Sequence, residues 1–185
     1  MNILIATRNS RKIGEASLGC QLFGITVEPV EVHFQEIQSK DPIEIALDKS
    51  AQAWEQVQAP VVVADTFWSI PALNGFPGAY MKEVTRWFRP EDFINLVWPY
   101  SDKRICFTET VVYRNADQHR VFSGEYWGLV SPEPRGDGIA IERVAEFDGH
   151  TIAERRNQGR YSHDPEHFVW AKFGAWFADQ KTAVD

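Results

Sequence analysis

A cluster of polar and basic side chains near the N-terminus has the composition of an anion-binding site. Thr7, Asn9 and Lys12, with two arginines between them, follow the short apolar run 3–6. Where a strand gives way to a helix, the free backbone amides of the first turn and nearby cations attract phosphate groups. The same residues also suit an ordinary capped helix with solvated basic side chains, and the two interpretations are balanced on this segment alone. The glycines of a Walker-type phosphate loop are missing.

Two carboxylates, Glu36 and Asp65, are candidate ligands for Mg²⁺. This ion keeps several waters and takes only one or two protein carboxylates together with substrate phosphates. It can neutralise phosphate charge and orient or acidify an attacking water. Glu36 alone is more typical of an exposed loop acid. Asp65 follows four apolar residues, so an unpaired charge there would be costly and a partner is expected. Lys49 lies off the apolar face of its predicted helix, and solvation is its default interpretation.

The stretch around Asp65 predicts a buried strand that stops at this carboxylate. The apolar run 61–64 has no polar alternation, which is typical of a strand buried on both faces in a sheet covered by helices. Ligands bind beyond the carboxyl ends of such strands, where Asp65 would emerge. The pairs Asn74-Gly75 and Pro77-Gly78 predict tight turns after it.

The rest of the chain alternates between strand and helix patterns before a hairpin and a closing helix. We find no internal repeat and no linker, and therefore predict one domain over residues 1–185. The predicted elements are a strand over 2–6, a helix capped by Asn9 or Ser10 and ended by Gly24, a strand over 25–34, a helix from Asp41-Pro42 to before Pro60, a short helix from Pro90, strands over 105–113 and 121–129 joined around Asn115, and a helix from Pro165.

Composition narrows the classes of partner. A formal net charge of −7 argues against non-specific binding to a nucleic-acid polymer. Cys20 and Cys106 are far apart in sequence, without metal-ligand spacing, so a disulfide framework or zinc site has little support. No run resembles a signal peptide and none could span a bilayer, so we expect no membrane partner and a cytoplasmic location.

Two further patterns are better explained without a ligand site or a catalytic site. Large aromatic and apolar residues recur near helical spacing over 168–177, which indicates core packing or a homodimer face rather than a ligand cage. The sequence Ser162-His163-Asp164 contains the residue types of a hydrolytic triad, but three consecutive residues cannot form the spatial relay that a triad needs. A serine hydrolase is therefore rejected.

Taken in order, these segments resemble the inosine triphosphate pyrophosphatase family of house-cleaning nucleoside triphosphate pyrophosphohydrolases. The agreement covers the first half of the chain, and the ordered set is specific although each piece alone is weak. The matched positions are Thr7, Asn9 and Lys12 for the opening Thr/Ser-Asn-Lys motif, Glu36 for the acidic loop residue, Lys49 for the helix lysine, Asp65-Thr66 after the valine-rich strand, and Ala72 to Tyr80 for Ala-Leu-x-Gly-x-Pro-Gly-x-Tyr.

The resemblance implies a mixed α/β fold, with a long central mixed β-sheet flanked by helices and two lobes with the active-site cleft between them. It also implies a homodimer and Mg²⁺-dependent cleavage, with Mn²⁺ as an alternative ion, of a nucleoside triphosphate to the monophosphate and pyrophosphate. Carried over by position, Glu36 and Asp65 would bind the metal and its water, and Asp65 could also accept the water's proton. Thr7, Asn9, Lys12 and Lys49 would hold phosphates, with Lys12 also counted among the catalytic residues.

The C-terminal third departs from the family pattern. Where the family has Phe-Gly-(Trp/Tyr)-Asp-Pro for base recognition, the best register gives residues 137–141, without the aromatics and the acid. The Thr-x-Ala-Glu motif survives at 151–154. Ser162 and His163 keep the base-binding positions of Ser-His-Arg, but Asp164 replaces the arginine and removes a five-donor fork. Trp68 or Trp127 could supply a replacement stacking surface, although core packing is favoured for both.

Two positions in the first half of the chain also differ from the family pattern. Arg8 replaces the family's usual glycine and adds a cation beside the phosphates, and Ala64 replaces an acid beside Asp65.

Two other functions are alternatives to hydrolysis by this family. A catalytically weakened nucleotide-binding or regulatory homologue is the main alternative, and a Maf-like pyrophosphatase is a third. Hydrolysis is favoured because the paired carboxylates and the phosphate-site lysines are all retained.

Overall fold

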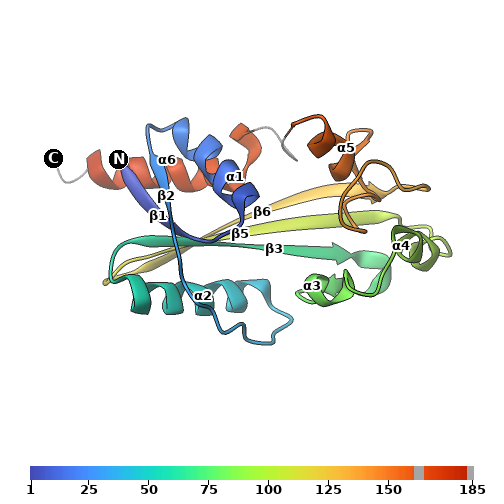
Figure 1. The fold of residues 1–185 in the computed structure, drawn as a ribbon, viewed down its shortest axis with the longest axis horizontal. Coiled ribbons are helices and arrows are strands. Elements are labelled where there is room, and N and C mark those ends of the chain that lie inside the picture. Colours follow the sequence, from blue (N-terminus) through green and yellow to red (C-terminus); the bar gives the residue numbers. More distant parts are fainter. Residues whose placement is uncertain (161–164, 183–185) are drawn as a thin grey trace. The chain divides into compact units, whose positions relative to one another are not determined.

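The computed structural model of this protein describes residues 1–160 and 165–182. In this part of the chain, eight strands form one mixed sheet in the order β2-β1-β3-β5-β6-β7-β8, and β4 pairs with β3 (Figure 1). The strands are β1 Asn2–Ala6, β2 Thr26–Val30, β3 Val61–Ile70, β4 Phe76–Gly78, β5 Arg104–Arg114, β6 His119–Val130, β7 Ala145–Phe147 and β8 His150–Thr151.

Helices flank the sheet, so the predicted mixed α/β class is confirmed. They are α1 Ser10–Gln21, α2 Pro42–Val57, α3 Met81–Val84, α4 Pro90–Val97, α5 Ile152–Asn157 and α6 Val169–Thr182, with 3₁₀ turns at Pro71–Leu73 and Pro165–His167. Among the described residues, none of these helices is both long and apolar enough to cross a lipid bilayer.

The described residues fall into two compact units. The first contains residues 1–65, 109–124 and 165–182, and the second contains residues 66–108 and 125–160. In the first unit, β1 is parallel to β2 and to β3, as the alternation of strands and helices predicts. Helices α1 and α6 lie on one side of these strands and α2 lies on the other (Figure 1). One domain over 1–185 stays a prediction.

Local sequence explains the beginnings of the two helices that carry candidate residues. Asn9 is the N-cap of α1, and its side chain accepts hydrogen bonds from the backbone N–H groups of Arg11 and Lys12. Asp41 caps α2 in the same way by accepting from Ile43 N–H, and Pro42 occupies the first helical position. Of the two caps predicted for α1, Asn9 or Ser10, the structure has Asn9, and the predicted start of α2 at Asp41-Pro42 is confirmed.

Each unit has its own apolar core. In the first, Val61 and Val63 of β3 pack with small residues of α2. Trp170, Phe173 and Phe177 of α6 are buried, which agrees with core packing, the first of the two alternatives predicted for 168–177, and Trp176 is partly exposed. Helix α6 approaches α1 closely at Gly19, where an added Cβ would lie 2.6 Å from Trp170 Cβ.

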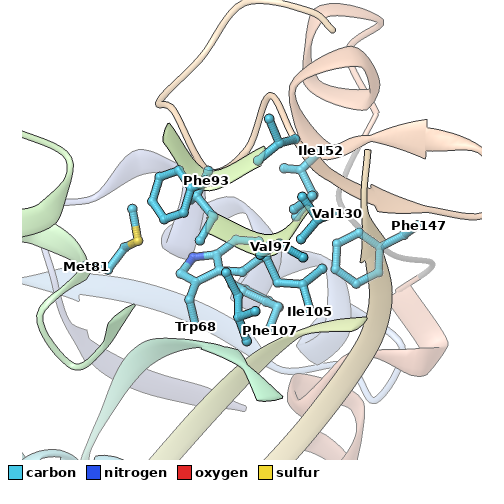
Figure 2. Close-up of a cluster of buried hydrophobic side chains, with 13 residues drawn as sticks. Trp68, Met81, Phe93, Val97, Ile105, Phe107, Val130, Phe147 and Ile152 are labelled. Atoms are coloured by element: carbon cyan, nitrogen blue, oxygen red, sulfur yellow. The ribbon is translucent and has the colours of Figure 1, made fainter. Parts of the chain in front are cut away.

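In the core of the second unit, Trp68 and Phe107 are central to a cluster of buried side chains (Figure 2), so Trp68 is core as predicted. Trp127 is 51% exposed, and its predicted core position is wrong.

Candidate active site

The turn between β1 and α1 is ordered by its own side chains. Thr7 Oγ1 accepts a hydrogen bond from Asn9 N–H at 3.1 Å, and Asn9 Oδ1 accepts from the N–H groups of Arg11 at 3.0 Å and Lys12 at 3.4 Å. Two amides of the first turn are therefore already bonded to Asn9. Anion binding here would depend on the neighbouring cations and the remaining polar groups, so the cap and the phosphate site are compatible functions of one segment.

Lys12 extends from the first turn of α1 to β3. Its Nζ donates to the carbonyl oxygen of Ala64 at 2.7 Å and lies 3.6 Å from Asp65 Oδ1. The side chain is only 14% exposed. Burial lowers the pKa of Lys12, and the nearby Asp65 carboxylate opposes this shift. The structure thus brings the first predicted phosphate ligand beside the predicted metal ligand.

Lys49 of α2 connects the two predicted metal ligands. Its Nζ lies 3.0 Å from Asp65 Oδ2 and 3.0 Å from Glu36 Oε1, and its side chain is 12% exposed. Burial would lower the pKa of Lys49, but Asp65 and Glu36 outweigh this effect and raise the pKa above its usual value. The default interpretation of Lys49 as a solvated lysine is therefore wrong, and the partner that Asp65 was expected to need is a pair of lysines.

Asp65 does not end its strand, contrary to the sequence-based expectation. β3 runs from Val61 to Ile70, so Asp65 lies in its middle. The reason is in the pairing: β1 pairs with β3 at Val61 and Val62, β4 pairs with it from Trp68 onward, and β5 is a further hydrogen-bonded neighbour of β3 in the sheet. The carboxylate lies on the stretch between the ladders with β1 and β4. The candidate site therefore lies beside the carboxyl end of β1, which α1 follows, and not at the end of β3.

Two glutamines of α2, which the sequence analysis missed, hold the loop that carries Glu36. Gln52 accepts from the backbone N–H of Gln35 and donates to its carbonyl oxygen, both at 2.8 Å. One helical turn later, Gln56 makes the same pair of bonds with His33, at 3.1 and 2.8 Å. In the sequence, the signal for this role was the spacing of four residues between the two glutamines, which places both on one face of the helix, together with the extended loop before it. These bonds position the half-exposed Glu36 against Lys49.

A second group of charged residues that the sequence analysis missed is buried beneath α1. Arg11 donates to both carboxylate oxygens of Glu15, at 3.0 and 2.7 Å. Glu109 of β5 accepts from Trp170 Nε1 at 3.3 Å. Both glutamates are almost completely buried. Burial and the neighbouring Glu15 raise the pKa of Glu109 to about 7. A charged residue inside the apolar run of β5 was the available signal.

Other sequence-predicted residues have ordinary structural partners. Arg8, which stands where the family has glycine, is exposed and forms an ion pair with Glu31 at 3.1 Å. In the second unit, the backbone N–H of Asp137 donates to Asn157 Oδ1 at 2.7 Å, and Asn157 Nδ2 donates to the Asp137 carbonyl at 3.2 Å. Ser162 and His163, the predicted base-binding residues, lie outside the described residues.

The surviving Thr-x-Ala-Glu motif forms the start of α5. Thr151 Oγ1 accepts from Glu154 N–H at 3.1 Å, and Glu154 Oε2 accepts from Thr151 N–H at 2.8 Å, which is a capping box. Thr151 Oγ1 also donates to the Arg135 carbonyl, and Arg135 forms ion pairs with Glu146 and Glu154. A structural role accounts for this motif without a ligand.

The donor set at Glu36 and Asp65 fits a hard divalent cation. The two nearest carboxylate oxygens each lie 3.0 Å from one ammonium nitrogen, so they are no more than 6.0 Å apart. Small side-chain rotations would let both reach one ion with oxygen distances of about 2.1 Å, the usual value for Mg²⁺. Within the described part of the chain, no group of three or more His, Cys, Asp or Glu could hold a metal. Two carboxylates suit an ion whose remaining ligands are phosphates and waters.

Comparison with known proteins shows the family and the fold of this chain. The model of the Ham1 family matches residues 3–163, and the chain therefore belongs to this family. A dITP/XTP pyrophosphatase from Hyperthermus butylicus is 32% identical over 166 residues, covering 87% of each chain. An inosine triphosphate pyrophosphatase from Neurospora crassa is 33% identical over 182 residues, covering 96% of this chain and 93% of the relative.

A solved structure of a HAM1 protein from Coxiella burnetii has the same fold. It aligns with a TM-score of 0.79 and covers 97% of this chain and 99% of its own, at 19% identity. The predicted family and fold are confirmed by these comparisons.

Proposed function

We propose that this protein hydrolyses a nucleoside or deoxynucleoside triphosphate to the monophosphate and pyrophosphate, with a divalent cation held by Glu36 and Asp65. Its family and its relatives make it a hydrolase of the nucleoside triphosphate pyrophosphatase class. The observation that supports the finer proposal is the convergence of two lysines on two carboxylates, with both lysine side chains largely buried. Such a group suits a substrate that brings negative charge and a metal ion together.

Lys12 and Lys49 would bind the phosphates. Both side chains are held in position by their protein contacts, so little ordering is needed when a substrate arrives. Thr7 and Asn9 shape the turn that precedes Lys12, and the Thr7 hydroxyl is an additional donor for a phosphate oxygen. In this assignment the cations orient the α,β-bridge of the triphosphate and stabilise the charge that develops on the departing pyrophosphate.

The reaction adds water to the α-phosphorus and breaks the bond from that phosphorus to the bridging oxygen, which leaves with pyrophosphate. The bond electrons leave with that oxygen, and the water loses one proton. Asp65 is our candidate acceptor of this proton, as the family resemblance implies, because its carboxylate is also a proposed ligand of the metal that would hold the water. When bound, the metal would polarise the phosphate and lower the pKa of the attacking water.

The remaining assignments follow the family resemblance. We propose Mg²⁺ as the ion, with Mn²⁺ as an alternative, and a homodimer in a cytoplasmic setting. Base preference would depend on residues 137–141, which differ from the family pattern. Inosine or xanthine triphosphates are the first candidates because the relatives are named for inosine, dITP and XTP.

The test is Mg²⁺-dependent release of pyrophosphate from a panel of standard, deaminated and modified nucleoside triphosphates. Asp65→Asn removes the shared carboxylate charge with little change in shape and should abolish release. Asp117→Asn makes the same change at an exposed turn of the first unit and should leave release unaffected. Nucleotide binding without release by folded wild-type protein would instead identify a regulatory homologue.

A further inference from the structure

The ammonium group of Lys49 contacts both carboxylates that are proposed to hold the metal. Its distances of 3.0 Å to Asp65 and 3.0 Å to Glu36 are those of strong charge-assisted hydrogen bonds. The α2 backbone anchors the lysine, and the two glutamine pairs from the same helix hold the Glu36 loop against it. The contact is therefore supported from both sides.

The charges of the four side chains at the proposed site are already balanced. Asp65 has Lys49 on one oxygen and Lys12 near the other, and Glu36 shares Lys49. Behind them, Arg11 is bonded to Glu15, whose charge it balances, and Glu109, whose pKa is raised to about 7, also interacts with Lys12. Two carboxylates thus face two ammonium groups, and a divalent cation bound to these carboxylates would give the group a net charge of +2.

A cation on the same oxygens would also lie close to Lys49. Mg²⁺–oxygen distances are about 2.1 Å, so an ion bound to Asp65 Oδ2 or Glu36 Oε1 would lie within about 5 Å of the ammonium nitrogen. Like charges at this distance repel strongly where one of them, the Lys49 ammonium group, is largely buried. A triphosphate removes the conflict, because its phosphates supply negative charge for the metal and an alternative partner for the ammonium group.

We propose that Lys49 excludes free divalent cations from Glu36 and Asp65, and that the metal enters with the triphosphate, whose phosphates take over the ammonium group. This inference rests on the proposed function, because it concerns the same site. It assigns Lys49 two successive partners, first the carboxylates and then the substrate. The consequence is that metal binding and nucleotide binding strengthen each other by the same factor.

The experiment measures Mn²⁺ affinity by electron paramagnetic resonance, with and without an α,β-methylene triphosphate analogue that cannot be cleaved at that bond. In the absence of the analogue, Lys49→Met should bind Mn²⁺ about tenfold more tightly than wild type, because the competing charge is gone. The analogue should raise the Mn²⁺ affinity of wild type, and it should raise that of Lys49→Met less.

Two control variants test whether the change in Mn²⁺ affinity comes from the positive charge at Lys49 itself. Lys172→Met removes the same charge from α6, where the lysine donates to the Ser123 carbonyl, and should leave Mn²⁺ affinity at the wild-type value. Lys49→Arg keeps the charge and should keep free-metal binding as weak as in wild type. Because it preserves the ion pairs, it also tests the inference if Lys49→Met fails to fold.

Each outcome decides between the inference and the function on which it rests. Unchanged or weaker Mn²⁺ binding by folded Lys49→Met, with wild type still gaining affinity from the analogue, overturns the inference and leaves the proposed function standing. If Lys49→Met and Lys172→Met gain Mn²⁺ affinity equally, the gain comes from the net charge of the protein, and the inference is overturned. Tight free-metal binding by Lys49→Arg overturns it as well. No Mn²⁺ binding by wild type even with the analogue overturns the proposed metal site itself.

Discussion

Charged residues have different partners in the two units. In the first unit, two ammonium groups and two carboxylates, from Lys12, Lys49, Glu36 and Asp65, meet beside the end of β1. In the second unit, Arg135 and Glu154 secure the start of α5 and the strands beside it. The contacts of the surviving Thr-x-Ala-Glu motif are therefore explained by structure alone, whereas the four-residue cluster of the first unit is the one proposed to bind a ligand.

The largest effect is expected at Lys12, which tests the functional half of this comparison. Lys12→Met keeps the length of the side chain but removes the proposed phosphate ligand. The value of kcat/KM for triphosphate cleavage should fall about 10²–10³-fold. The free energy of unfolding should change by only about 1–2 kcal/mol, because the lost bond to Ala64 is offset by removal of a largely buried charge.

Pyrophosphate release and chemical denaturation measure these two quantities. Lys172→Met is the matched control for loss of a lysine in the same unit. A fall in kcat/KM no larger than that of the control would remove Lys12 from the substrate site.

The starts of α1 and α2 could be predicted because the residues that determine them are close in sequence. Asn9 and Asp41 are capping residues beside the first helical turn, and the valine run of β3 is a contiguous apolar segment. The extent of β3 could not be predicted, because it depends on its pairing with three partner strands, β1, β4 and β5. Sequence alone contained no signal for that register.

The site residues were predicted, but their pairings were not. The family resemblance indicated Lys49 and Asp65, yet the periodicity of α2 predicted a solvated lysine, since an off-face position is usually exposed. The contact at 3.0 Å depends on the packing of α2 against β3, because Asp65 lies 16 residues after Lys49 in the chain. Glu109 and Glu15 were missed for the same reason, because their buried surroundings come from β5, α1 and α6 together.

The next effect concerns Glu109, a buried carboxyl group of the first unit that lies outside the cluster of Lys12, Lys49, Glu36 and Asp65. It faces Glu15, Arg11, Lys12 and the Trp170 N–H. Its pKa is raised from the usual value of 4.5 to about 7, so the folded protein holds a proton that the unfolded chain releases between these values. Stability therefore falls as pH rises from about 4.5 to 7, and the loss is complete above pH 7.

Glu109→Gln removes this pH-dependent loss and can still accept from Trp170. Its free energy of unfolding should match that of wild type near pH 5 and exceed it by about 2–3 kcal/mol at pH 8. Urea denaturation at the two pH values measures the difference. Glu55→Gln, at an exposed position of α2, is the control for the same chemical change. A stability difference that is equal at both pH values would contradict the raised pKa.

The smallest effect is expected at Thr151, which tests the structural half of the comparison. Thr151→Ala removes the hydroxyl that caps α5 and donates to the Arg135 carbonyl, so the free energy of unfolding should fall by about 1–2 kcal/mol. Thr151→Ser keeps the hydroxyl and should retain most of the stability. Both variants should keep the wild-type kcat/KM and base preference at temperatures where they are folded. An altered base preference with unchanged stability would place Thr151 at the substrate and remove the distinction between the two units, because the motif would then bind the ligand as well as cap the helix.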